Sequence, residues 1–77
     1  MDFSPTISVK QGYIVVDVTA PEALPTTRYA YYLYETTQGV VEKRGYSKEA
    51  SCLFQPPADG NYYVKVFVRS YSKELPN

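Results

Sequence analysis

Few side chains in this sequence could carry out catalysis. The chain contains no histidine, so the most common general base and nitrogen ligand is missing, and a Ser-His or Cys-His nucleophile is excluded. The only cysteine, Cys52, lies in an apolar segment where a thiolate is disfavoured, and we expect it to be a buried small apolar residue. A single cysteine also excludes an internal disulfide.

The carboxylates are scattered and form no recognisable site. They show neither the Asp-x-Asp spacing nor the acidic cluster typical of calcium sites, and they fall in separate segments, at Asp17, Glu35, Glu42, Glu49 and Asp59. The four glycines are dispersed and form no phosphate-cradling loop. A chain of 77 residues also offers little room for a deep cleft that excludes water. We therefore predict no catalytic residue, no cofactor and no metal, and a protein that is not an enzyme.

Tyrosine is the one residue type in excess, with nine in the chain. If segments 28–35 and 61–69 pair as strands, alternation places four aromatic residues on one outer face: Tyr32, Tyr34, Tyr63 and Phe67. Three basic residues would lie at its rim: Arg28, Lys65 and Arg69. Such a face can stabilise a small sheet through cross-strand pairs, contact a neighbouring domain or a second copy, or stack on sugar rings.

The elements that must position these residues are β-strands. Val, Ile, Tyr and Phe come in short alternating runs separated by Gly, Pro, Asp and Gln, and no segment shows a helical stripe. We predict six strands, over residues 6–10, 13–19, 28–35, 40–46, 49–54 and 61–69. Gln11-Gly12 and Thr37 to Gly39 predict turns, and the prolines in 20–25 and 55–60 predict longer connections.

The alternation also assigns the inner and outer faces. We predict these inward residues: Ile14, Val16, Val18, Tyr29, Tyr31, Leu33, Ala50, Cys52, Phe54, Tyr62, Val64, Val66 and Val68. Ile7 and Val9 share one face of the first strand. Asp17 supports this register, because a slip of one residue would bury its carboxylate. The polar run Glu42, Lys43 and Arg44 suits an exposed edge strand.

This pattern predicts one all-β domain over residues 1–77, with its core over about 6–69, cut from a larger protein. We expect an antiparallel β-sandwich of six to seven strands, in which the third, fourth and sixth strands pack on the first, second and fifth. Residues 70–73 could supply a short seventh strand. Otherwise the last long strand keeps an open edge, available for strand addition, for exchange with a second copy or for completion by the parent protein.

The stretch FQPPADGNYYVKVFV resembles the entry into the penultimate strand of immunoglobulin-like and fibronectin type III domains, and implies a tyrosine corner in which Tyr62 bonds back to the preceding loop. Two longer stretches, YAYYLYETTQGVVEKRGYS and CLFQPPADGNYYVKVFVRS, together resemble the triple-tyrosine domains of bacterial sensors. They are still more similar to small accessory β-sandwich domains of bacterial surface-polysaccharide biosynthesis proteins. These resemblances imply an immunoglobulin-like accessory module in a larger bacterial protein.

Net charge narrows the range of partners. Eight basic and eight acidic residues cancel, so no long-range field attracts nucleic acid or anionic lipid, and we expect neither nucleic-acid binding nor membrane insertion. No signal peptide and no apolar stretch of about 20 residues is present, and localisation stays unassigned. The leading hypothesis is a protein-interaction module that contacts a neighbouring domain or a second copy; the alternative is a carbohydrate-binding module that uses the tyrosine-rich face.

Overall fold

The computed structural model describes residues 3–21 and 23–71, and this part of the chain is all β. It forms six strands: β1 (Ser4–Lys10), β2 (Tyr13–Thr19), β3 (Thr27–Glu35), β4 (Gly39–Ser47), β5 (Ser51–Phe54) and β6 (Tyr62–Ser70). All six predicted strands are therefore confirmed, with bounds that differ by no more than two residues. No helix in the described residues is long and apolar enough to cross a membrane.

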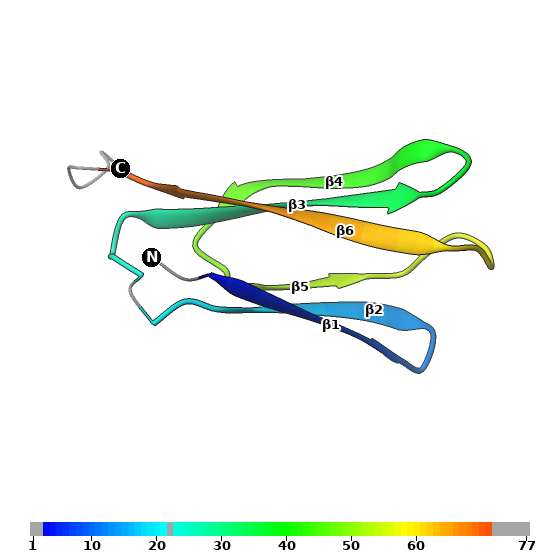
Figure 1. The fold of residues 1–77 in the computed structure, drawn as a ribbon, viewed down its shortest axis with the longest axis horizontal. Helices are drawn as coiled ribbons and strands as arrows, with labels where there is room; N and C mark the ends of the chain where they lie inside the picture. The colour runs from blue at the N-terminus through cyan, green and yellow to red at the C-terminus, as the bar shows by residue number, and fades with distance from the viewer. Residues whose placement is uncertain (1–2, 22, 72–77) are drawn as a thin grey trace.

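The strands form two antiparallel sheets, in the orders β1-β2-β5 and β4-β3-β6. This is the division of strands that the sequence predicts. Figure 1 shows the two sheets as separate layers, one above the other. Every hairpin is short, because strands that follow one another in sequence and pair antiparallel need only a tight turn. The turn between β1 and β2 has positive φ at both Gln11 (52°) and Gly12 (83°), as a two-residue hairpin turn requires.

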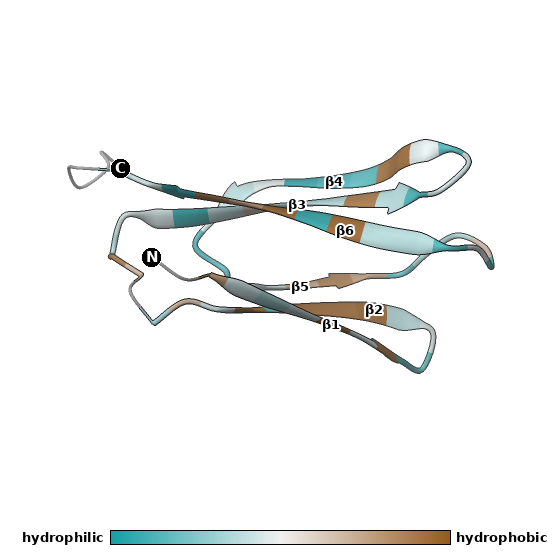
Figure 2. Ribbon diagram, viewed as in Figure 1, coloured by the Kyte–Doolittle hydropathy of each residue, from teal (hydrophilic) through white to brown (hydrophobic). Residues whose placement is uncertain are grey.

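The core lies between the two layers and comes from alternate residues of three strands. Its buried members are Ile14, Val16, Val18, Tyr29, Tyr31, Leu33 and Phe54. Partly buried residues pack around them, including Ala50, Cys52, Tyr62, Val64, Val66 and Val68. The predicted inward face of each strand is thus confirmed, although the β6 valines are half-buried. Figure 2 shows the hydrophobic residues along β2 and at intervals along β6.

β1 follows the alternation but contributes little to the core. Ile7 pairs with Val16 and Val9 pairs with Ile14. The side chains of Ile7 and Val9 therefore lie on the same side of the sheet as core residues. They are nevertheless 48% and 73% exposed. Strand period therefore specifies the direction of a side chain, whereas the depth of its burial depends on what covers it.

The region predicted to supply a seventh strand does not form one where it is described. Ser70 is the last residue of β6 and Tyr71 belongs to no strand, while residues 72 and 73 lie outside the described residues. Within residues 3–21 and 23–71, β6 pairs with β3 alone, from Glu35↔Tyr62 to Thr27↔Ser70 without a register shift. The other edge of β6 is open in this part of the structure.

Candidate interaction face

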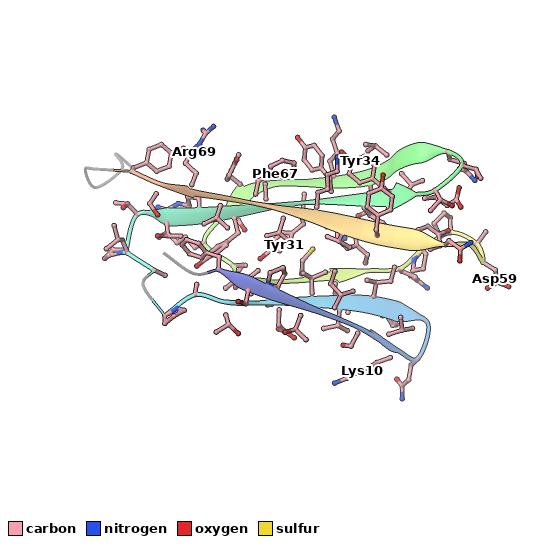
Figure 3. The ribbon with its side chains drawn as sticks, in the orientation of Figure 1. Lys10, Tyr31, Tyr34, Asp59, Phe67 and Arg69 are labelled. Carbon is pink, nitrogen blue, oxygen red and sulfur yellow. The ribbon has the colours of Figure 1, made fainter. Side chains whose placement is uncertain are left out.

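The structure brings the four predicted aromatic residues together on the outer side of the β4-β3-β6 sheet. We call the set Tyr32, Tyr34, Tyr63 and Phe67 the tyrosine face. The rings of Tyr34 and Tyr63 are stacked, with centroids 4.9 Å apart and planes 3° apart. Those of Tyr32 and Phe67 meet edge to face, with the same separation of 4.9 Å and an angle of 61°. Figure 3 shows Tyr34 and Phe67 pointing away from the other sheet, while Tyr31 points between the sheets.

Pairing of β3 with β6 explains this arrangement. Tyr34 and Tyr63 are directly opposite each other in the register, so their side chains rise from neighbouring points on one face. Phe67 lies opposite Ala30, whose small side chain leaves room for the Tyr32 ring to approach. The sequence pattern therefore positions both aromatic pairs, given only that these two strands pair in this register.

Two of the three predicted basic residues contact aromatic rings. The Lys65 ammonium lies 4.8 Å from the centroid of the Tyr34 ring. The Arg69 guanidinium lies 4.6 Å from the centroid of Tyr46, and its Nη1 lies 3.3 Å from the Tyr71 hydroxyl. A cation within about 6 Å of a ring centroid is attracted by the negative face of the ring. These rings hold Lys65 and Arg69 in place without neutralising their charge.

Arg28 lies at the end of this face and is engaged elsewhere. It sits opposite Arg69 in the register. Its Nη1 donates hydrogen bonds to the carbonyl oxygens of Pro25 and Thr27, at 3.0 and 2.9 Å. The guanidinium is thus bound to the main chain of the connection before β3 and of the first residue of β3.

β4 supplies two further members of the surface that the sequence reading missed. Lys43 lies opposite Tyr32 and places its ammonium 5.0 Å from the centroid of that ring. Tyr46 lies under the guanidinium of Arg69. The β3–β4 pairing contains two register shifts, so the position of each β4 side chain could not be counted from the turn at Gly39.

The surface around the tyrosine face is positive although the whole chain is neutral. Three cations lie over aromatic rings there: Lys43, Lys65 and Arg69. On the outer side of β3, β4 and β6, the described residues include no carboxylate. Glu42 pairs with Leu33 and so belongs to the inner side of its strand, where it forms an ion pair of 2.6 Å with Arg44. Within residues 3–21 and 23–71, these three basic groups form no ion pair with a carboxylate.

Among the described residues, the carboxylates and the single cysteine are the candidate metal ligands and reactive groups. No three His, Cys, Asp or Glu side chains in residues 3–21 and 23–71 gather closely enough to hold a metal ion. Burial raises the pKa of the Cys52 thiol, although Arg44 opposes the rise, so the reactive thiolate is disfavoured. Glu35 is a buried carboxylate with a structural role: hydrogen bonds from Thr37 and Gln38 lower its pKa and fix the turn after β3.

The ring geometry also limits what the face can bind. Two parallel rings with centroids 4.9 Å apart are too close to lie side by side in one plane, so Tyr34 and Tyr63 cover part of each other's faces. Lysine ammonium groups lie over the rings of Tyr32 and Tyr34. The four rings therefore form two contacting pairs, and a lysine ammonium lies over one ring of each pair. They do not form a flat coplanar platform.

One local feature agrees with the family motif quoted above. The Tyr62 hydroxyl donates a hydrogen bond of 2.7 Å to the carbonyl of Ala58 in the preceding loop. A comparison of the chain with protein-family models, curated proteins and solved structures finds no match. The likeness to immunoglobulin-like domains therefore rests on the sequence motifs and on this bond.

Proposed function

We propose that this chain is a non-catalytic interaction module with an immunoglobulin-like β-sandwich fold, and that it binds protein through the tyrosine face. One observation carries the proposal: four aromatic rings and three cations collect on one outer sheet face, with no carboxylate of the described residues among them. The fold serves to present this face on paired strands, which hold the side chains in fixed relative positions.

The composition of the face favours a protein partner. Tyrosine, phenylalanine and arginine are enriched where interfaces carry most of their binding energy. Tyr63 and Phe67 are 44% and 36% exposed, so contact with a partner would remove apolar ring surface from water. Because Lys65 and Arg69 are already held against rings, little side-chain entropy would be lost when they bind a carboxylate. The partner surface that fits combines apolar side chains with Asp or Glu.

The setting of this interaction is inferred from the sequence resemblance. The motifs over 29–47 and 52–70 are similar to accessory domains of bacterial surface-polysaccharide biosynthesis proteins. We accordingly propose that the face contacts a neighbouring domain in a larger protein of this kind. A carbohydrate-binding module is the alternative. It is less favoured because the stacked pair of Tyr34 and Tyr63 and the lysines over Tyr32 and Tyr34 leave fewer ring faces free for a sugar.

A selection from a random peptide library displayed on phage tests the proposal. We expect the immobilised chain to enrich peptides that combine Asp or Glu with aromatic or aliphatic residues, and their binding to weaken as salt rises. The double variant Tyr63→Ser with Phe67→Ser should lose this binding and keep its circular dichroism spectrum. The matched control changes two exposed residues on the other sheet, Tyr13→Ser and Leu53→Ser, and should bind normally.

Two results would overturn the proposal. If the selected peptides bind the Tyr63→Ser/Phe67→Ser variant as well as the wild type, the tyrosine face is not the binding surface. If instead the chain selects no peptide but binds sugars on a glycan array, and the same double variant abolishes that binding, the face belongs to a carbohydrate-binding module.

A further inference from the structure

Among the strands of the described residues, β6 is the least protected edge strand. The other three edges are each blunted: β5 has four residues, β1 begins Ser4-Pro5, and β4 combines two register shifts with a run of charged residues. Short length, proline, bulges and charge all hinder the addition of another strand. β6 has nine residues, contains neither proline nor glycine, and pairs with β3 without a shift.

The main-chain groups on this edge can be assigned from one hydrogen bond. Thr36 N–H donates to the Asn61 carbonyl at 3.0 Å, which extends the β3–β6 ladder by one pair beyond Glu35↔Tyr62. Hydrogen-bonded pairs alternate along an antiparallel ladder. Every second β6 residue counted from Asn61 therefore bonds to β3: Tyr63, Lys65, Phe67 and Arg69. The residues between them, including Val64, Val66 and Val68, direct N–H and C=O toward the open edge.

An apolar groove lies beside the same strand. It has a volume of about 290 Å³ and is lined by Ile7 and Val9 of β1 and by Tyr62 and Val64 of β6, among others. These β1 side chains point toward the core but are largely exposed. A strand added next to β6 would therefore satisfy main-chain groups and also lie near apolar surface that the described residues leave uncovered.

We infer that this edge binds the β6 strand of a second copy of the chain, antiparallel, with a two-fold axis at Val66. In this register Val66 faces its counterpart, and Val64 faces Val68 of the second copy. Both are pairs of residues whose main-chain groups point to the open edge, so they can exchange hydrogen bonds. The two β4-β3-β6 sheets join into one continuous sheet, and Val68 of the second copy lies beside the groove.

The outer face of β6 selects this register. Its residues alternate between rings and cations, in the order Tyr63, Lys65, Phe67 and Arg69. With the axis at Val66, Tyr63 lies opposite Arg69 of the second copy and Lys65 opposite Phe67. Each cation, which in the single chain lies over a ring of its own sheet, thereby gains a ring of the second copy within reach, in the non-hydrogen-bonded pairs where side chains are closest.

The two adjacent registers lack this complementarity. An axis at Lys65 places two copies of that lysine opposite each other, and an axis at Phe67 places Lys65 opposite Arg69. Like charges directly opposite across strands are destabilising. Registers with the axis at Val64 or Val68 also place a cation opposite a ring, but they pair fewer residues of β6 than the axis at Val66 does. If one β6 strand slipped by a single residue relative to the other, inner side chains of one copy would lie opposite outer side chains of the second. The inference does not rest on the proposed function, because it uses the edge of the sheet and needs no partner protein.

Disulfide trapping tests the register directly. In a Cys52→Ser background, Val66→Cys should form a disulfide-linked dimer in a glutathione buffer, because hydrogen-bonded partners have Cα atoms about 5.5 Å apart, within disulfide range. Val64→Cys and Val68→Cys should each stay monomeric alone and cross-link when mixed. Self-linking of Val64→Cys, or failure of Val66→Cys to link, would overturn the proposed register.

Light scattering over a concentration series tests the association itself. The wild type should double its mass as concentration rises. Val66→Pro should remain monomeric and keep its β-sheet spectrum, because the lost N–H points away from β3 and proline is tolerated on an edge. Val66→Thr, of similar size with its N–H intact, should still dimerise. A wild type that is monomeric throughout, or a folded Val66→Pro that still dimerises, would overturn the inference.

Discussion

The two flanks of the molecule differ in how far they are closed. On the flank formed by β4 and β5, Arg44 Nη2 donates to the Leu53 carbonyl at 3.0 Å and its guanidinium lies 5.0 Å from the centroid of the Phe54 ring. On the flank formed by β1 and β6, no described hydrogen bond joins the two strands, and an apolar groove separates them. One flank is bridged from sheet to sheet, and the other is open.

This difference shows that strand alternation does not by itself enclose a core. Both flanks carry inward apolar residues at the expected period, yet Phe54 is fully buried whereas Val9 is 73% exposed. What distinguishes them is the presence of a long side chain on the edge strand that reaches the facing sheet. We therefore expect the closed flank to determine stability and the open flank to determine association.

The largest expected effect comes from truncating an apolar side chain to alanine on each flank and comparing the two losses of stability. Phe54→Ala should cost about 3–5 kcal/mol, because a fully buried ring is lost and a cavity remains. A core in a domain of this size contributes only about 3–5 kcal/mol in net stability, so the variant should be largely unfolded. Val9→Ala should change the free energy of unfolding by less than about 0.5 kcal/mol. Urea denaturation at low protein concentration measures both, and equal losses would contradict the comparison.

A smaller effect separates the two edges of β6. Lys65→Pro removes an N–H that we assign to the ladder with β3, which leaves a main-chain carbonyl without its partner and should cost about 1–3 kcal/mol. Val66→Pro removes an N–H that points to the open edge and should cost less. Lys65 is exposed, so its side chain adds little to the difference, and Lys65→Ala is the control. Thermal unfolding of dilute protein measures the order; a reversed order would show that the assignment of N–H directions is wrong.

The period of two in the sequence predicted most of the fold. It identified all six strands and the buried residues Val16, Leu33 and Phe54, whereas the division into sheets followed from the expected β-sandwich arrangement. The same period predicted the tyrosine face, because Tyr34 and Tyr63 meet once β3 and β6 pair in register. These features depend only on the direction in which each side chain points, which alternation determines.

The remaining features depend on events that no local pattern encodes. Lys43 and Tyr46 join the outer face through register shifts in β4, and a shift changes the count from the turn onward. Arg28 bonds to the loop before β3, and that loop has no periodic signal. The exposure of Val9 reflects a missing neighbour, which alternation along β1 cannot reveal.

The smallest predicted effect concerns the hydrogen bond that fastens β3 to the segment before β5. Tyr31 is only 2% exposed, and its hydroxyl donates to the Glu49 carbonyl at 2.7 Å. Tyr31→Phe keeps the ring and removes this bond, so it should lower the free energy of unfolding by about 1 kcal/mol at neutral pH. Tyr13→Phe, on the exposed face of the other sheet, is the control and should have no measurable effect.

The pH dependence of the same variant tests whether the Tyr31 hydroxyl is buried in the folded state. Burial, followed by the nearby Cys52, raises the pKa of Tyr31 from 10.0 to about 12 in the folded state. The unfolded chain therefore loses this proton first, and the Tyr31 contribution is fully present below pH 10 and declines as pH rises from there toward 12. Tyr31→Phe lacks that contribution, so the stability gap between wild type and variant should narrow over this range. A gap that stays constant in urea denaturation from neutral pH to about pH 11 would show that the Tyr31 hydroxyl loses its proton equally easily in the folded and the unfolded chain, and therefore that burial does not raise its pKa.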